Sequence, residues 1–362
     1  MSPKDVITPS IDRSRIVAPA VPANSISRKH LFHLFETGLP GVTVVAAPAG
    51  YGKSSLVAQW IESSPLPTVW LNVSALDSTQ SFFAHVLAAI RVQFPDFGSN
   101  FENEPSANPL LNVQKLTGAA GELKEAFNFV LDNGPADSPD VTSVAQALVD
   151  FIPSNVHLII VRRMTPTTSL ARYASLGNLS LITSQDLKFS EAEVSKIAEL
   201  NGLQQIDTNS AKLIDRCEGW PAAVQMMSRS IARGQQNSQF ELNTTSNPLA
   251  ILALETFNSL NEENRSKISR LLLVQEFDLE TAAIILGEDF SDSYINKLAT
   301  DGMFVSVSSG SNRVFRFNEI FYEGLSGLHV EKSDATKQIH DKLATHYCLL
   351  YTSPSPRDRQ KS

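Results

Sequence analysis

The chain has 362 residues, with 30 Lys and Arg against 38 Asp and Glu, a formal net charge of −8 and an isoelectric point near 5.4. A hydrophobic content of 42% excludes wholesale disorder, and the length suggests about two or three domains. The acidic balance argues against a chain that coats nucleic acid or an anionic membrane through bulk charge. There is no apolar run of the ~18 residues that span a bilayer, no secretory signal and no disulfide framework, so we expect a cytoplasmic protein.

The first half of the chain alternates strands with helices. Residues 1–27, rich in Pro and Ser, are predicted to form an extended arm. Within residues 28–184, strands are predicted at 42–46, 68–73, 127–131 and 157–161, and helices at 31–37, 54–62, 79–92, 141–151 and near the end of the loose stretch 94–121. Such alternation requires crossover connections and a sheet covered on both faces. The pattern predicts an α/β fold with a doubly wound parallel sheet.

After residue 184 the pattern changes to helices. Ser190 and Glu193 form a capping box that opens a helix ending at Leu200. Further helices are predicted at 210–216 and 222–233, so that residues 185–247 form a helical block that closes with a polar linker at 234–247.

Residues 248–347 are mostly helical as well, with one exception. Two short runs, 303–308 and 313–317, surround a Gly/Ser turn and indicate a β-hairpin. Several helices followed by such a hairpin suggest a winged-helix domain.

The C-terminal residues 348–362, CLLYTSPSPRDRQKS, break the helical pattern. They resemble translated sequencing-adapter read-through, and a natural disordered tail is the alternative. We interpret them as a non-native tail, which predicts that the chain is a fragment.

Residues 47–54, APAGYGKS, fit the relaxed phosphate-binding loop pattern, with Ala in the first position instead of Gly. Gly50 and Gly52 let consecutive N–H groups face phosphate oxygens, and the helix that follows adds its partial positive charge. Lys53 would reach the β- and γ-phosphates, and the Ser54 hydroxyl would ligate Mg²⁺. The position between a buried strand and a helix favours this reading over a Gly-rich turn without a ligand. The predicted nucleotide-binding residues of the loop are Ala47, Pro48, Ala49, Gly50, Tyr51, Gly52, Lys53, Ser54 and Ser55.

A strand ending in Asp should follow such a loop, and residues 127–132, FNFVLD, supply it. Asp132 is therefore predicted to hold Mg²⁺ with Ser54 and to be a catalytic residue with Lys53. A turn residue at a strand end is the alternative. The next residue, Asn133, stands where hydrolysing P-loop proteins usually carry a second acid, and an amide cannot take a proton from water as a general base. The sequence predicts nucleotide binding with slow or absent hydrolysis.

Arg163 follows the fourth predicted strand. An Arg at this edge of the sheet can sense the γ-phosphate, which makes Arg163 the third predicted catalytic residue, with a solvated loop Arg as the alternative. We expect His157 to be a strand residue at the surface, and Trp70 and Trp220 to be packing residues.

The string AAPAGYGKSSLVAQW, preceded by Ser27-Arg28, resembles the ATPase domain of MalT-like regulators of the LuxR type, which belong to the STAND class of signal-transduction ATPases. Further pieces match in order over about residues 11–346, namely Leu131-Asp132, Arg163 and Pro166, Leu187 to Glu193, Gly219-Trp220-Pro221, and Phe317 to Phe321. The resemblance implies an α/β P-loop NTPase domain followed by an α-helical lid and a winged-helix domain. It adds Arg28 and Pro221 to the nucleotide-binding residues, with Pro221 near the adenine.

Three departures from the family pattern limit what the resemblance implies. Asn133 replaces the second acid, Arg162 replaces the sensor Ser, and Asn318-Glu319 stand where relatives carry His-Pro. Hydrolysis and a His contact from the winged helix are therefore not carried over. Family members continue into sensor repeats and a C-terminal helix-turn-helix that binds DNA, so DNA is implied as a partner only through that missing element.

Three functional hypotheses follow. The first is an ATP/ADP-responsive switch module of a transcriptional regulator, binding its nucleotide with Mg²⁺ and self-associating on ATP binding. The second is a turnover ATPase, in which hydrolysis itself is the output. The third is a nucleotide-locked scaffold for partner proteins. None of the three predicts a membrane partner.

Overall fold

The computed structural model describes residues 11–22, 25–74, 77–99, 101, 108–133, 139–163, 170–203, 207–233, 248–258, 260–300, 304–308, 313–326 and 334–352. The chain divides into two compact units, residues 1–200 and 201–362. Of the helices within the described ranges, none combines the length and apolar character that crossing a bilayer requires.

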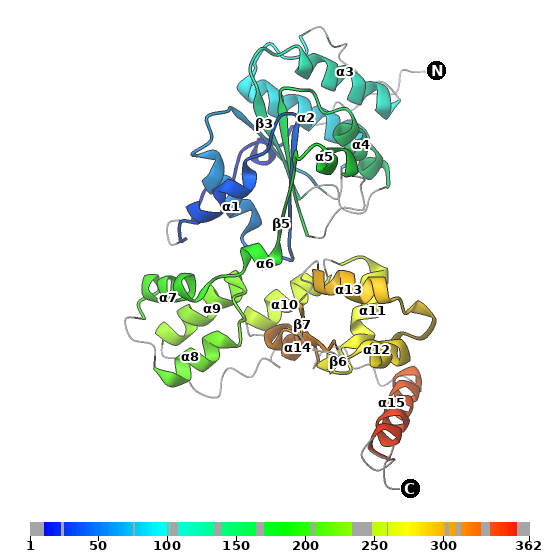
Figure 1. The fold of residues 1–362 in the computed structure, drawn as a ribbon. Helices are drawn as coiled ribbons and strands as arrows, with labels where there is room; N and C mark the ends of the chain where they lie inside the picture. The colour runs from blue at the N-terminus through cyan, green and yellow to red at the C-terminus, as the bar shows by residue number, and fades with distance from the viewer. Residues whose placement is uncertain are drawn as a thin grey trace, which may run out of the picture. The chain divides into compact units, whose positions relative to one another are not determined.

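A five-stranded parallel sheet forms the centre of the first unit (Figure 1). Its strands lie in the order β2-β3-β4-β1-β5 and are β1 (Gly41–Ala46), β2 (Thr68–Asn72), β3 (Phe127–Asp132), β4 (Val156–Arg162) and β5 (Leu179–Thr183). The strands β1, β3 and β4 are mostly apolar and are buried along almost their whole length, because helices cover both faces. The predicted parallel α/β sheet is confirmed, whereas β5 at its edge was not predicted.

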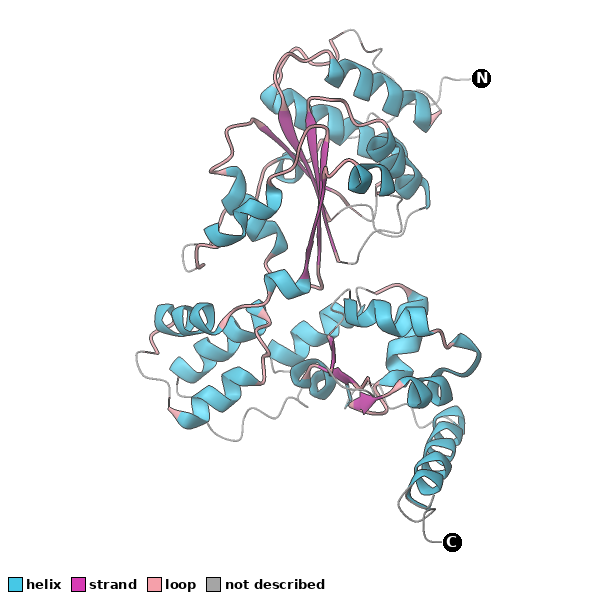
Figure 2. Ribbon diagram, viewed as in Figure 1, coloured by secondary structure: helices cyan, strands magenta, loops and turns pink. Residues whose placement is uncertain are grey.

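The first unit contains the following helices, several of which lie on one side or the other of this sheet (Figure 2). They are η1 (Arg13–Ile16), η2 (Lys29–Phe35), α1 (Lys53–Ile61), α2 (Thr79–Gln93), α3 (Pro109–Gly121), α4 (Pro139–Asp150), α5 (Ala171–Ser175), α6 (Ser184–Leu187) and α7 (Glu191–Leu200). The main core packs alternate strand residues such as Val44, Leu71 and Leu131 with apolar residues of α2, α3 and α4. On α1, the indole of Trp60 stacks on Phe35 of η2 at 4.6 Å between ring centroids.

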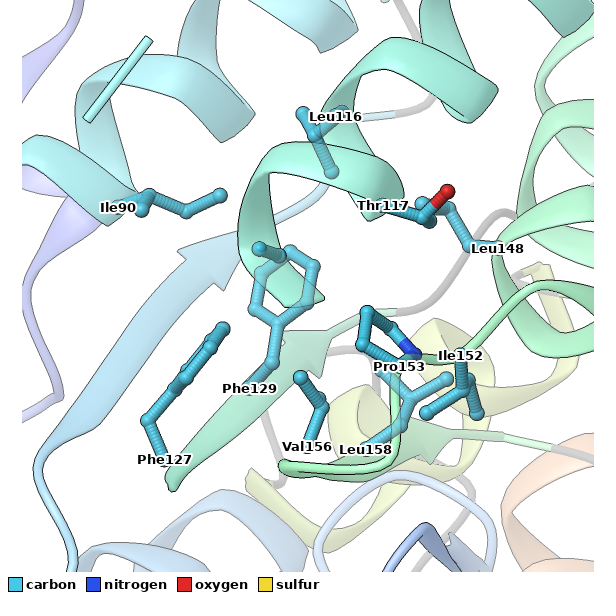
Figure 3. A pocket seen from close by; sticks show the side chains of 11 residues that line it. Ile90, Leu116, Thr117, Phe127, Phe129, Leu148, Ile152, Pro153, Val156 and Leu158 are labelled. Atoms are coloured by element: carbon cyan, nitrogen blue, oxygen red, sulfur yellow. The ribbon is translucent and has the colours of Figure 1, made fainter. Parts of the chain in front are cut away.

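A small apolar cavity of about 20 Å³ lies at the amino end of the sheet (Figure 3). Phe127 and Val156, the first residues of β3 and β4, point into it together with Phe129 and Leu158. Because the lining is almost entirely apolar, this end of the sheet serves packing.

His157 is buried, so the expectation of a surface residue was wrong. Its ring lies in an apolar strand covered on both faces, where Nε2 is 2.8 Å from Oγ1 of Thr43 and the ring meets Trp60 edge-on. Burial lowers the pKa of His157 to about 4, so the side chain is neutral at pH 7.

The second unit contains the remaining helices and a small sheet. Its helices are α8 (Thr208–Asp215), α9 (Pro221–Ala232), α10 (Pro248–Asn258), α11 (Glu262–Leu271), α12 (Leu279–Leu286), η3 (Gly287–Asp289), α13 (Asp292–Thr300), α14 (Glu319–Ser326) and α15 (Asp334–Thr352). The strands β6 (Glu276–Phe277), β7 (Val305–Val307) and β8 (Phe315–Phe317) form an antiparallel sheet in the order β6-β8-β7. The predicted hairpin is confirmed as the pair β7–β8.

Aromatic rings connect the start of α9 with α14 in this unit. Trp220, fully buried as a packing residue, lies 4.6 Å from the ring of Phe304, which stacks on Phe321 at 4.4 Å. Phe304 has a φ of +57°, a conformation that costs a bulky residue energy and is retained only where packing holds it. Nearby, Arg216 forms ion pairs with Glu319 at 2.7 Å and Glu323 at 2.5 Å, which join α8 to α14.

Some predictions fall at or beyond the edges of the described ranges. The linker 234–247, Pro166 and residues 353–362 lie outside them. The sequence predicted that the helical pattern breaks at residue 348. Helix α15 instead continues to Thr352. The proposed domain boundaries stay predictions.

Candidate phosphate-binding site

The phosphate-binding loop connects β1 directly to α1. Ala46 is the last residue of the strand, and Lys53 is the first residue of the nine-residue helix. Gly50 and Gly52 have φ values of +76° and +74°, which glycine adopts without the strain that a side chain would bring. A Cβ at Gly52 would meet no atom within 4 Å, so its requirement is conformational. The turn presents the positive end of α1 at the carboxyl edge of the sheet, where ligands of open α/β sheets bind.

Lys53 is a half-buried cation at this edge. Its Nζ donates to the carbonyl of Pro48 at 2.8 Å. Burial and, secondarily, the charge of Arg163 lower the pKa of Lys53 to about 8, against the opposing influence of Asp132. Because the charge of Arg163 acts on Lys53, the structure brings these two predicted catalytic residues near each other. The Arg163 residue is exposed.

Asp132 and Ser54 are in direct contact, close enough to bind one metal ion together. The Ser54 hydroxyl donates to Oδ1 of Asp132 at 2.9 Å, although the two residues are 78 positions apart in the chain. Burial raises the pKa of Asp132, while the bonds from Ser54 and Asn133 and the charge of Lys53 offset part of the rise. A carboxylate and a hydroxyl are hard oxygen ligands, so these residues fit Mg²⁺.

Asn133 occupies the position after Asp132 in a left-handed conformation, with φ +54°, which Asn tolerates better than most residues. Its backbone N–H donates to Oδ1 of Asp132 at 2.9 Å, and its side-chain Nδ2 donates to Oδ1 of Asn72 at 3.0 Å. Asn72, which pairs with Asp132 between β2 and β3, is therefore also an amide. Sequence reasoning did not single out Asn72, because nothing in the pattern of β2 links its last residue to residue 133.

Arg28 makes its contacts with the opening of α7. Its guanidinium donates to Glu193 at 2.8 Å and to the carbonyls of Leu187 at 2.9 Å and Lys188 at 3.2 Å, and it lies over the ring of Phe189. Glu193 also accepts hydrogen bonds from the backbone N–H and the hydroxyl of Ser190, which confirms the predicted capping box. A contact of Arg28 with nucleotide stays a prediction.

The remaining predicted residues divide between the two units. Ala47 and Tyr51 are buried within the loop, and Ser55 lies in the first turn of α1. Pro221 is the first residue of α9 in the second unit, and its part in the site stays a prediction.

Comparison with known proteins finds several similar transcriptional regulators. The chain is 23% identical over 336 residues to the HTH-type transcriptional regulator MalT of Vibrio cholerae serotype O1, covering 86% of this chain and 36% of the relative. It is 23% identical over 325 residues to the regulator of the same name from Serratia proteamaculans, with 85% and 35% covered. For that of Yersinia pestis (strain Pestoides F) the identity is 24% over 326 residues, with the same shares covered. The chain thus spans about a third of the length of these relatives.

Solved structures show only distant similarity. The Aeropyrum pernix ORC1 protein in complex with DNA matches with a TM-score of 0.40 and 12% identity, covering 91% of this chain and 96% of that one. The Thermotoga maritima RuvB branch migration motor matches with a TM-score of 0.36 and 15% identity, covering 83% and 95%. Scores this low carry no argument, and no family model matches. The sequence comparisons confirm the resemblance to MalT-like transcriptional regulators over about 85% of the chain.

Proposed function

We propose that this chain is the nucleotide-responsive module of a MalT-like transcriptional regulator and that it binds ATP or ADP with Mg²⁺ at residues 47–55. The observation that carries the proposal is the convergence of Lys53, Ser54 and Asp132 at the carboxyl edge of a parallel sheet. The similarity to regulators named MalT supports a role in transcription regulation.

The side chains of the site suit a polyphosphate. Lys53 and Arg163 repel each other in the free protein, so an anion between them would relieve that repulsion and raise the pKa of Lys53. Ser54 and Asp132 would hold the metal, which when bound neutralises part of the nucleotide's charge. The loop N–H groups and the start of α1 complete the phosphate contacts.

A switch requires that ATP and ADP differ in their affinity for two arrangements of the protein. The γ-phosphate is the only chemical difference between the two nucleotides. Arg163 and Asn133 flank the place where it would lie, and they are therefore the proposed sensors. The helices and the β6-β8-β7 sheet of the second unit support a winged-helix domain as the part that reports nucleotide occupancy.

Titration calorimetry with ATP and with ADP tests the binding site. Lys53→Ala should abolish measurable binding of both nucleotides, because it removes the cation that reaches the β- and γ-phosphates. Lys196→Ala is the matched control, since Lys196 is an exposed lysine on α7 that pairs with Glu199. Unchanged ATP affinity in Lys53→Ala would contradict the site assignment.

Turnover is the second candidate function, and the amides at positions 72 and 133 argue against it. We expect steady-state phosphate release far below about 1 s⁻¹, the low end of ordinary enzyme rates. Asp at position 133 also tolerates the left-handed conformation, and Asn133→Asp should increase phosphate release by about 100-fold or more if a base is all that is lacking. Sustained wild-type turnover above that limit would favour an ATPase.

The scaffold hypothesis differs from the switch in its response to nucleotide. Protease digestion with ATP and with ADP should give different fragment patterns if the module switches. Identical patterns would support a locked scaffold.

A further inference from the structure

The segment Ile11–Val17, which we call the N-terminal strap, is bound to the edge strand β2 and to α2. Ile16 is buried in the main core, and Arg15 of η1 holds the segment in place. Arg15 Nε donates to the carbonyl of Asn72 at 2.9 Å, and Arg15 Nη1 donates to Oδ1 of Asp77 at 3.0 Å, with a second bond between the same two side chains. The sequence predicted only an extended arm here.

The partners of the strap form a fully hydrogen-bonded polar cluster. Asp77 and His85 are buried, and both receive hydrogen bonds from the strap. Burial alone would raise the pKa of Asp77, but bonds from Arg15, Ser74 and Ser81 lower it below its usual value, so Asp77 is a charged partner for Arg15. A buried, doubly bonded ion pair is a costly arrangement to break from one side, and the strap is therefore a fixed part of the unit.

The strap is connected to the phosphate site through one residue. Asn72 ends β2, with its carbonyl bound by Arg15 and its side-chain oxygen bound by Nδ2 of Asn133. Asn133 in turn donates its backbone N–H to Asp132, which accepts the hydroxyl of Ser54. A continuous path of hydrogen bonds thus runs from Arg15 to the residues that would hold Mg²⁺.

We propose that Arg15 is a positioning residue that sets the preference of the site for ATP over ADP. By holding the end of β2 it fixes Asn72, and through Asn72 it fixes the amide of Asn133 beside the place of a γ-phosphate. ADP leaves that place empty, so loosening Asn133 weakens ATP binding more than ADP binding. The inference rests on the proposed function and assigns the strap a part in it.

Calorimetric titration of Arg15→Met with ATP and with ADP tests this inference. We expect ATP affinity to fall about tenfold or more, within the usual range of coupling between sites, and ADP affinity to change less than about threefold. Arg13→Met is the matched control, because Arg13 is an exposed residue of the same η1 helix. Arg15→Lys should fall between the two, since one ammonium group cannot reproduce the fork that reaches both Asp77 and Asn72.

A double-mutant cycle identifies the route. Asn72→Ala removes the side-chain link to Asn133 but keeps the carbonyl that Arg15 binds, so it should produce the same ATP-specific loss. The effects of Arg15→Met and Asn72→Ala should then not add in the double variant. Asn72→Ala also serves as the test if Arg15→Met fails to fold.

The outcomes separate this inference from the proposed function. Equal losses for ATP and ADP, no loss, or fully additive effects would overturn the role of Arg15 while leaving nucleotide binding intact. A wild-type chain that binds neither nucleotide would instead refute the proposed function.

Discussion

Two bases with lowered pKa values, the buried His157 and the half-buried Lys53, lie at opposite ends of the parallel sheet of the first unit. His157 lies beside Gly41, the first residue of β1, and Lys53 follows the loop at the end of the same strand. Burial lowers their pKa values to about 4 and about 8, from ordinary values of 6.5 and 10.5. The same kind of desolvation therefore leaves His157 neutral at pH 7 and Lys53 charged, because their starting values differ.

The surroundings of the two bases differ as well, because those of His157 are mostly apolar and those of Lys53 are charged. At the amino end, His157 meets Thr43, an aromatic ring and apolar strands, and the first residues of β3 and β4 line an apolar cavity. At the carboxyl end, Lys53 is accompanied by Asp132 and Arg163. The apolar surroundings at the amino end of the sheet serve stability, whereas for the carboxyl end we propose anion binding. Each prediction below tests that division.

The largest expected effect is at the amino end. Phe127→Ala removes a fully buried ring from the cavity wall and should lower the free energy of unfolding by about 3–5 kcal/mol. ATP affinity of the folded variant should not change. Phe151→Ala, at an exposed ring, is the control and should have little effect. Chemical denaturation and calorimetry measure both quantities, and a loss of ATP affinity in Phe127→Ala would break the division.

His157 should make the folded chain less stable at acidic pH. Unfolded chains bind a proton at this residue below about pH 6.5, whereas the folded chain binds one only near pH 4, so stability falls as pH decreases through this window. The loss should approach about 3 kcal/mol at pH 4, at 1.36 kcal/mol for each unit between the two pKa values. Unfolding free energies of His157→Gln should lack this component, and those of His33→Gln, at an exposed His, should retain it.

Lys53 should make nucleotide affinity fall at alkaline pH. Above about pH 8 the free protein loses the ammonium proton, and binding of a polyphosphate must restore it, so affinity should fall by up to about tenfold per pH unit, or about 1.4 kcal/mol. Calorimetry at pH 8 in buffers of different ionisation enthalpy should show proton uptake on ATP binding. Affinity that is constant between pH 7 and 9.5 would contradict the assigned pKa.

The smallest expected effect is an increase in stability. Val156→Ile adds one methylene beside the 20 Å³ cavity and should raise the free energy of unfolding by about 0.5 kcal/mol, from about 24 cal/mol per Å³ filled. ATP affinity should stay constant. A loss of stability on denaturation would show that the cavity cannot accept the added group.

The local features of the first unit could be predicted from the sequence because each depends on neighbours in the chain. The alternation of apolar runs and helices gave the parallel sheet, and the spacing of Gly50, Gly52 and Lys53 located the loop. The edge strand β5 was missed because Leu179–Thr183 is short and half-exposed, with Leu181 45% accessible. An exposed strand of this kind lacks the continuous apolar run that marks its neighbours.

The pairing of Ser54 with Asp132, 78 residues apart, could be predicted because both residues belong to a known motif. Contacts between distant positions outside that motif could not be predicted. Thr43 lies 114 residues from the His157 ring that it contacts, and no pattern in either strand announces the pair. Likewise, Arg28 and Glu193 are 165 residues apart, and Arg15 and Asp77 are 62 apart. Such pairs depend on the tertiary arrangement, which a single sequence does not specify locally.

The burial of Trp220 has a practical consequence for spectroscopy. The chain contains three tryptophans, of which Trp60 and Trp70 belong to the first unit and Trp220 belongs to the second. Replacing the first two by Phe would leave Trp220 as the single tryptophan, packed against Phe304 and shielded from water while the second unit is folded. Its emission would shift to the red when water reaches the indole, so the unfolding of the second unit can be followed by itself in an unlabelled chain.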